Sequence, residues 1–255
     1  MRQIKLTLQY DGSGYSGWQV QDNQSTIQGL LEDAVFKVTG ERMRITGASR
    51  TDAGVHAFAQ VAAFKTGSSL APQVFIRALN AKIPQDIRVI NAEESSSDFH
   101  PRYSAKNKRY SYLISRAGDY SVFLRRYSWQ MNYQLNSDSM REAADHLAGT
   151  HDFSSFRASG CGSKNPVRTI FKIEVSELPS IDFMSFNFNV PLIKISMQAN
   201  SFLRHMVRNI VGMLVEIGRG RHPASQMKEV LSLKDRSFSG PAAPANGLFL
   251  EEINY

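Results

Sequence analysis

The sequence predicts an α+β protein built from two similar halves. Over residues 4–90, strand and helix patterns follow one another in the order β-α-β-β-α-β, which is the order of a ferredoxin-like fold. The rest of the chain repeats this mixture of strands and helices, with insertions. With 255 residues, of which 42% are hydrophobic, the chain can bury a substantial core.

The first strand and the first helix have clear patterns. Apolar and polar residues alternate over residues 4–10, which predicts a half-buried strand. A loop at 11–19 follows, rich in glycine and aromatic residues, and it suits either ligand binding or packing under a sheet edge. Ser25 and Gln28 fit a capping box, and apolar residues at helical spacing over 27–38 predict an amphipathic helix.

Four more elements complete the first half. Residues 43–46 and 60–64 are β-prone and flank a loop at 47–57. A helix is expected at 72–81, with a proline in its first turn, and a strand at 87–90. These elements give an antiparallel sheet with helices on one face.

A polar and acidic stretch predicts the boundary between the halves. Residues 93–98 contain three consecutive serines, so we expect one domain at 1–98 and a second at 99–255. In the second domain the patterns predict strands at 109–115, 167–175 and 248–253, and helices at 137–147, 201–217 and 224–233. Residues 182–198 fit either one long strand or a pair of strands broken near Pro191.

Composition narrows the classes of partner. Lysine and arginine number 30 against 23 acidic residues, which gives a net charge of +7. This charge favours nucleic acid as the partner, and the alternative is a basic surface that is only solvated. The single cysteine, Cys161, excludes an intramolecular disulfide and a cysteine-based metal cluster. No P-loop, dinucleotide fingerprint or His-x-x-x-His pair occurs, so no metal or cofactor is expected. Because no apolar run reaches about 18 residues, we expect a cytoplasmic protein without a membrane segment.

The loop at 47–57 holds the best candidate for catalysis. Asp52 is its one carboxylate, and a carboxylate ionised at neutral pH can act as a nucleophile. In a closed site it needs a cationic partner, which Arg50, or Arg204 and Arg208 at i and i+4 on the expected helix, could supply. Solvent-facing arginines and a structural Asx-turn at Asp52 are the alternatives.

Aromatic and basic residues alternate in two adjoining segments, at 99–103 and 106–109. RNA-binding surfaces combine phosphate contacts with stacking in this way. In the next strand, Tyr110 and Tyr112 share one face with Ile114.

These segments, taken in order, resemble the TruA-type tRNA pseudouridine synthases nearly from end to end. The most specific match is Arg-Thr-Asp-Ala-Gly-Val-His at 50–56. The others are Tyr10-Asp11-Gly12, Gly17-Trp18-Gln19, Asp98-Phe99-His100-Pro101-Arg102-Tyr103, Lys108-Arg109-Tyr110-Ser111-Tyr112, the stretch 151–157, Phe202-Leu203-Arg204-His205-Met206-Val207-Arg208-Asn209 and Gly247-Leu248.

The resemblance implies isomerisation of uridine to pseudouridine at positions 38–40 of the tRNA anticodon stem-loop, without a metal or organic cofactor. Asp52 would be the nucleophile, with attack on C6 of the base, attack on C1′ of the ribose and a glycal route left open by the sequence. Arg50 would help to extrude the target nucleotide. Tyr110 would pack on the flipped uracil, and Arg208 would form the ion pair with Asp52. Arg204 would then contact phosphate or be structural.

The resemblance also implies a fold and partners. It implies two ferredoxin-like halves with joined antiparallel or mixed sheets, a central active-site cleft, and a homodimer that binds tRNA. Two segments would touch the tRNA, namely Phe99, His100, Pro101, Arg102, Tyr103 and Gly160, Cys161, Gly162, Ser163, Lys164. The alternatives are a non-catalytic RNA-binding or tRNA-folding protein, or a related synthase with other target positions. Ser49, where the family often has glycine, and Leu70, where it often has a basic residue, depart from the pattern.

Overall fold

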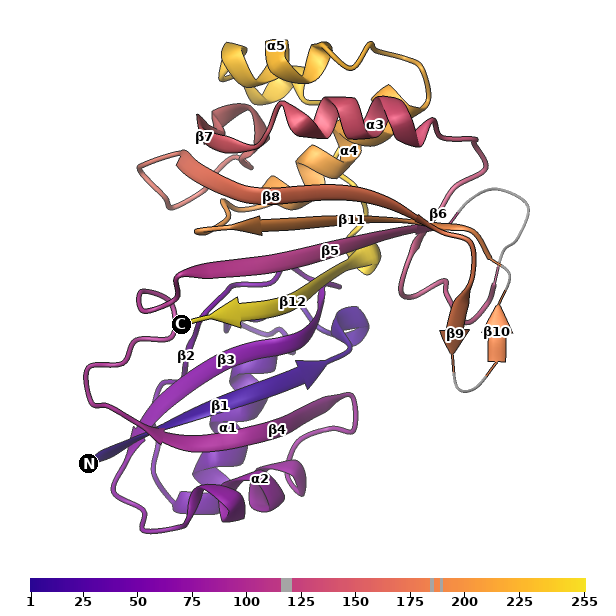
Figure 1. Ribbon diagram of the computed structural model, residues 1–255. Coiled ribbons are helices and arrows are strands. Elements are labelled where there is room, and N and C mark those ends of the chain that lie inside the picture. Colours follow the sequence, from indigo (N-terminus) through magenta and orange to yellow (C-terminus); the bar gives the residue numbers. More distant parts are fainter. Residues whose placement is uncertain (116–120, 184–185, 189) are drawn as a thin grey trace. The chain divides into compact units, whose positions relative to one another are not determined.

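A computed structural model describes residues 1–115, 121–183, 186–188 and 190–255 (Figure 1). The chain forms two compact units, one of residues 1–108 with 249–255 and one of residues 109–248. Strands and helices occur in both units, which confirms the α+β class. The domain boundary expected between residues 98 and 99 stays a prediction.

The sheet of the first unit has the strand order of a ferredoxin-like fold. Strand β1 (Arg2–Tyr10) lies between β4 (Ile87–Ser95) and β3 (His56–Thr66) and is antiparallel to both. The short strand β2 (Thr46–Gly47) is antiparallel to β3, and β12 (Leu248–Asn254) is parallel to it.

Strand β3 begins earlier than expected. Its first two residues, His56 and Ala57, pair with Phe249 and Leu250 of β12. The expected strand at 60–64 is therefore too short. Pairing with β1 extends it at both ends, from Ala57 to Thr66, and β12, from the far end of the chain, also pairs with its first two residues. The expected strand at 43–46 is also wrong in its bounds, since only Thr46 and Gly47 pair with β3.

The two helices of the first unit begin and end for local reasons. Helix α1 (Ile27–Thr39) is capped by Thr26, whose hydroxyl accepts from the Gly29 amide at 3.3 Å, so the capping box expected at Ser25 is wrong. The helix ends at Gly40, whose φ of 75° is left-handed. Helix α2 (Pro72–Asn80) has its proline in the first turn, where no amide is needed.

The second unit has its own sheet, in the order β5 (Asn107–Ser115), β11 (Leu192–Ala199), β8 (Val167–Leu178) and β7 (Gly149–Asp152). Strand β8 is antiparallel to both β11 and β7. The remaining strands are β6 (Trp129–Gln130), parallel to β5, and the antiparallel pair β9 (Ile181–Phe183) and β10 (Phe186–Phe188). A single strand over 182–198 is thus wrong. The chain is broken near Pro191, as the alternative allowed, but the part before the break forms two strands rather than one.

Three helices accompany this sheet (Figure 1). They are α3 (Ser137–Asp145), capped by the Asn136 side chain, α4 (Met206–Gly218) and α5 (Gln226–Leu233). Nearly every residue of α4 is buried, so this helix forms the centre of the unit's core. In the described part of the chain, no helix is long and apolar enough to cross a membrane.

Helix α4 begins five residues later than the sequence predicted. His205, just before it, has a left-handed φ of 61°, which interrupts the helical path that the apolar spacing suggested from Ser201. Arg204 therefore precedes the helix. The expectation that Arg204 and Arg208 share one helix face is wrong.

Gly212→Ala is expected to destabilise the protein by about 1–3 kcal/mol, although alanine normally favours a helix over glycine. A Cβ atom at Gly212 would lie 1.8 Å from the backbone oxygen of Pro241, so the backbone must move. Urea unfolding measures the change. Gly162→Ala is the control, because a Cβ atom there meets nothing within 4 Å. An unchanged unfolding midpoint for Gly212→Ala would contradict the close packing.

Candidate active site

The loop that carries Asp52 lies between β2 and β3 of the first unit. Within it Arg50 is exposed, Thr51 is buried and Asp52 is partly exposed. The Ala48 amide donates to the Val61 carbonyl at 2.8 Å, and the Val55 amide donates to the Asp52 carbonyl at 3.1 Å. The start of the loop is thus bonded to strand β3, and its end is closed by a hydrogen bond within the loop.

A buried amide side chain holds the loop at Ser49. Gln60, on β3, is 0% exposed. Its Oε1 accepts from the Ser49 and Val61 amides, both at 3.2 Å, and its Nε2 donates to the Ser49 carbonyl at 2.7 Å. Nε2 also donates to the Tyr10 hydroxyl at 3.4 Å, so all four hydrogen-bonding positions of the amide are used.

Tyr10 extends this network to Thr51. Because its hydroxyl accepts from Gln60, it has its own proton to donate to the Thr51 hydroxyl, 2.8 Å away. Burial raises the pKa of Tyr10 to about 12, against the opposing effect of hydrogen bonds with Thr51 and Gln60. The hydroxyl therefore stays protonated at neutral pH, and Thr51, next to Asp52, keeps its partner.

The loop at 11–19 packs against the Asp52 loop. A Cβ atom on Gly12 would lie 2.0 Å from the Val55 oxygen, and one on Gly17 would lie 2.5 Å from the Thr51 oxygen. The Trp18 amide donates to the Thr51 carbonyl at 3.0 Å, and its ring is 2% exposed. Of the two alternatives that the sequence left open for this loop, the structure favours packing.

The aromatic and basic segment at 99–103 divides into inner and outer residues. Phe99 packs on Tyr255, with ring centroids 5.0 Å apart, and Pro101 is buried. Arg102 is exposed, and Tyr103 is 77% exposed, with its ring centroid 4.3 Å from that of His100. The outer residues can meet a ligand, whereas Phe99 and Pro101 hold the segment in place.

Sequence reasoning overlooked Gln60, Tyr10 and Lys108 as parts of the site. Lys108 is buried on β5, and its ammonium donates to the carbonyl of Ala48. A polar residue inside an apolar strand pattern was the available signal for Gln60. For Lys108 the signal was its position two residues before Tyr110, on the same side of the expected strand.

In the second unit, Tyr110 and Arg208 are both held by neighbours. Tyr110 is 5% exposed and meets Phe202 edge-on, with ring centroids 5.2 Å apart. The expected buried face of Tyr110, Tyr112 and Ile114 is confirmed. Arg208, in the first turn of α4, donates from Nε to the Ala243 carbonyl at 2.7 Å, which orients its guanidinium.

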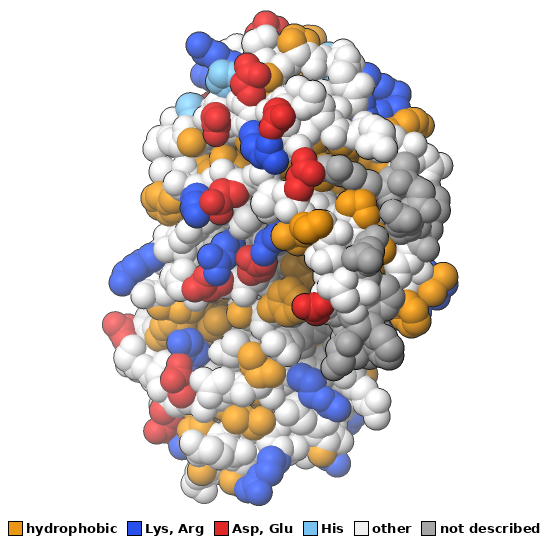
Figure 2. Space-filling view, turned by 45° about the vertical axis from the view of Figure 1, so that its right-hand side comes forward, with side chains coloured by type: hydrophobic (Ala, Val, Ile, Leu, Met, Phe, Trp, Pro, Cys, Tyr) orange, Lys and Arg blue, Asp and Glu red, His pale blue; other side chains and the backbone are white. Residues whose placement is uncertain are grey.

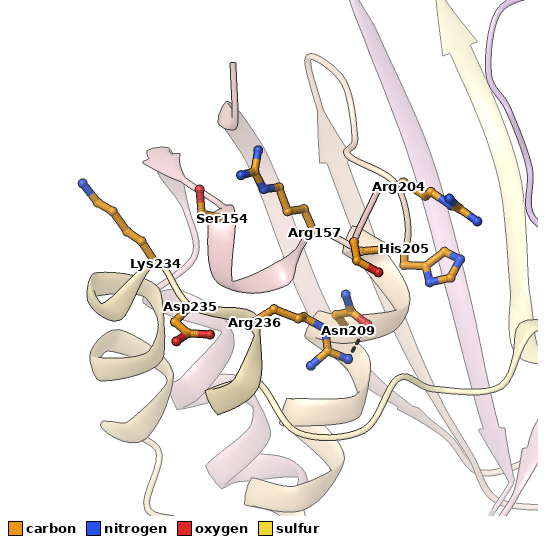
Figure 3. Close-up of a pocket in the computed structure, with 10 residues that line it drawn as sticks. Ser154, Arg157, Arg204, His205, Asn209, Lys234, Asp235 and Arg236 are labelled. Carbon is orange, nitrogen blue, oxygen red and sulfur yellow. Dashed lines mark hydrogen bonds between the residues drawn. The ribbon is translucent and has the colours of Figure 1, made fainter. Parts of the chain in front are cut away.

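A pocket of about 670 Å³ lies beside the start of α4 (Figure 3). Its cationic residues are Arg157, Arg204, Lys234 and Arg236, with Asp235 as the acidic one. Figure 3 shows Arg157 and Lys234 extending outward, while Arg236 turns toward Asn209 and donates to its Oδ1 at 3.1 Å. Arg236 thus helps to build the pocket. At the rim, the Lys234 ammonium lies 3.8 Å from the Asp152 carboxylate, and Arg157 also lies near enough to help lower the pKa of Asp152.

The segment at 160–164 adjoins this pocket. Gly160 has a left-handed φ of 69°, and the Ala158 amide donates to the Arg204 carbonyl at 3.0 Å. Burial opposes ionisation of the Cys161 thiol, but backbone amides and nearby arginines outweigh it, so the pKa of Cys161 is lowered. Gly160, Gly162 and Lys164 are exposed, whereas Cys161 and Ser163 are half-buried.

The predicted site residues therefore fall into two groups. Asp52, Arg50 and the 99–103 segment belong to the first unit, and Tyr110, Arg204, Arg208 and the 160–164 segment belong to the second. The ion pair between Asp52 and Arg208 joins residues of different units and stays a prediction. Among the described residues, no group of three or more His, Cys, Asp or Glu side chains could hold a metal ion.

Charge is not uniform on the surface. Figure 2 shows acidic side chains intermixed with lysines and arginines over the upper part of the face in view. The net charge of +7 is therefore not spread evenly over this face. Local groups such as the pocket cations matter more than the total.

Gln60→Leu is expected to lower the free energy of unfolding by at least about 2 kcal/mol, because the buried amide and carbonyl of Ser49 both lose this partner. Urea unfolding measures the loss. The control is Gln24→Leu, an exposed glutamine bonded to Ser16, which should change stability by less than about 0.5 kcal/mol. Equal effects of the two substitutions would contradict the role of Gln60.

Comparison with known proteins identifies the family. The profile of a family described as tRNA pseudouridine synthase matches residues 7–104 and 143–255. The chain is 42% identical to tRNA pseudouridine synthase A of Thermoanaerobacter sp. (strain X514) and 43% identical to tRNA pseudouridine synthase A 2 of Clostridium perfringens, over the full length of each. It is also 43% identical to tRNA pseudouridine synthase A of Myxococcus xanthus, over all of this chain and 92% of that one. The chain belongs to the tRNA pseudouridine synthase family, and it isomerises uridine to pseudouridine in tRNA.

Proposed function

We propose that this enzyme modifies uridines 38–40 in the anticodon stem-loop of tRNA and uses Asp52 as its nucleophile. The observation that carries the proposal is the anchoring of the Asp52 loop. Buried partners hold Ser49 and Thr51 on either side of Arg50, while Asp52 itself stays partly exposed. A reactive group on a rigid frame is held in its productive geometry before the substrate arrives.

The reaction needs a nucleophile and access to the base, but no net change in composition. The bond between uracil N1 and ribose C1′ breaks, the uracil turns, and C5 bonds to C1′. The proton on C5 is lost to the surroundings, and N1 gains a proton. Asp52 supplies the carboxylate that attacks, and any bond that it forms to C1′ of the ribose or C6 of the uracil breaks again before the product leaves, so no external group is consumed.

The remaining roles follow from position and exposure. Arg50 is exposed and two residues from Asp52, so it can enter the space left by an extruded nucleotide. Tyr110, which is 5% exposed and edge-on to Phe202, is the residue proposed to contact the uracil and to assist removal of the C5 proton. Arg208, oriented by the Ala243 carbonyl, is the partner proposed for the Asp52 carboxylate, which must stay charged to attack.

Two sets of residues are proposed to hold the tRNA backbone and its bases. In the first unit they are the exposed Arg102 and Tyr103, a cation beside a stacking surface. In the second unit they are the pocket-rim cations Arg157 and Lys234, with the exposed Lys164. The full-length identity to enzymes named tRNA pseudouridine synthase A supports the same substrate class. A homodimer acting on tRNA in the cytoplasm is part of this proposal.

Treatment of unmodified tRNA with the enzyme should produce pseudouridine at positions 38–40, and Asp52→Asn should abolish it. The substitution removes the charge with almost no change in shape, so tRNA affinity should stay within a few-fold. Site-resolved pseudouridine mapping and release of tritium from C5-labelled uridine measure the two outcomes. Asp33→Asn, an exposed aspartate on α1, is the control and should retain full activity.

Two results would overturn parts of the proposal. Appreciable tritium release by Asp52→Asn would exclude it as the nucleophile. Pseudouridine at other positions would identify a synthase with a different target, and its absence from every tRNA tested would leave a non-catalytic tRNA-binding protein.

Arg157→Gln and Lys234→Gln should each weaken tRNA binding and reduce the slope of log affinity against log salt by about 1, because each phosphate contact releases counterions. Filter binding at several salt concentrations measures both quantities. Lys228→Gln is the control, an exposed lysine on α5 outside the pocket lining. If all three variants have the same slope as the unmodified enzyme, the pocket rim does not bind the tRNA backbone.

A further inference from the structure

A lysine is buried directly beneath the Asp52 loop. Lys108 is 5% exposed, and its ammonium donates to the carbonyl of Ala48. Ala48 is itself fully buried, and its amide donates to Val61 on β3. Lysine is among the residues least often buried, so this position requires an explanation.

The charge of Lys108 is not neutralised by an acidic partner. Over the described residues, the structure gives its ammonium the Ala48 carbonyl as a partner but no carboxylate. Burial, and then the like charge of Arg102, lower the pKa of Lys108 to about 8. The side chain is therefore mostly charged at neutral pH, and holding it there costs folding free energy.

A fold that needed only to fill this space would do better with an apolar side chain. Methionine has nearly the same length as lysine and carries no charge to desolvate. Replacing buried charges by apolar residues is often neutral or stabilising. The buried Ala48 carbonyl would lose its donor in a methionine variant, so the use of the ammonium lies in what this carbonyl holds in place.

The role of Lys108 follows from the backbone group that its ammonium binds. Lys108 binds the Ala48 carbonyl, and Gln60 binds the next carbonyl, that of Ser49. Two successive peptide planes leading to Arg50 and Asp52 are thus fixed by buried donors from different strands. A bond to an ionised donor is stronger than one between neutral groups, so the ammonium makes the stiffer contact.

We propose that Lys108 is a positioning residue, which fixes the backbone from Ala48 to Asp52 for the isomerisation. It acts through the loop and does not itself touch the uridine. The inference rests on the proposed role of Asp52 as nucleophile. A small displacement of a reactive group can slow a reaction on the order of 100-fold, so loss of this bond should be visible in the rate.

The test compares Lys108→Met, Lys108→Arg and the exposed-lysine control Lys82→Met. Single-turnover pseudouridine formation at saturating tRNA gives the rate, filter binding gives the tRNA dissociation constant, and urea unfolding gives stability. Lys108→Met should react about 10- to 100-fold more slowly. Its dissociation constant should stay within about threefold. Its urea midpoint should change little, because removal of a buried charge offsets the loss of the donor to the buried Ala48 carbonyl. Lys108→Arg should recover most of the rate, because it keeps a charged donor.

Other outcomes overturn the inference. A Lys108→Met variant that fails to fold, or has a lower urea midpoint, would show that Lys108 serves stability. An unchanged rate, or a loss confined to tRNA affinity, would remove the positioning role. Asp52→Asn, measured in parallel, separates the two proposals. An inactive Asp52→Asn with a fully active Lys108→Met overturns only the role of Lys108, whereas an active Asp52→Asn overturns the nucleophile assignment itself.

Discussion

Close backbone packing between two loops is the constraint on which the Asp52 region depends. Gly12 and Gly17 bring one loop so near the other that any side chain at these positions would meet the backbone oxygens of Val55 or Thr51. This approach buries Thr51 and leaves space for the hydrogen bonds of Tyr10 and Gln60. The position of the carboxylate is therefore set by the backbone contacts around Asp52.

The two buried polar side chains under this loop, Gln60 and Lys108, differ in the free-energy cost of their burial. The Gln60 amide uses all of its hydrogen-bonding positions, so its burial is offset within the fold. Lys108 is charged and has a carbonyl but no acid as its described partner, so its burial is not offset in the same way. Gln60 therefore stabilises the loop, whereas Lys108 fixes the loop at a cost in folding free energy.

Local patterns predicted much of the fold correctly. The alternation in β1, the apolar stripe of α1 and the buried face of Tyr110, Tyr112 and Ile114 all arise from periodicity within a few residues. Two errors had non-local or unusual causes. Strand β3 is extended by pairing with β1 and, at its start, with a partner some 190 residues away in sequence, which places Phe249 opposite His56. The start of α4 depends on a left-handed histidine, a conformation that is rare for a residue other than glycine.

The site residues likewise divide into those that a local sequence pattern reveals and those that only the folded structure reveals. Asp52 and Arg50 are visible in the sequence because they occur in one short motif, whereas Lys108 and Gln60 become visible only when burial is known. Strand β12 adds a consequence for biosynthesis. Phe249 and the residues after it belong to the first unit, so a nascent chain that already carries Asp52 still lacks the partner of His56. Strand β12 must be synthesised and leave the ribosome before this sheet can close, and fragments that stop short of β12 would carry Asp52 on an unfinished sheet.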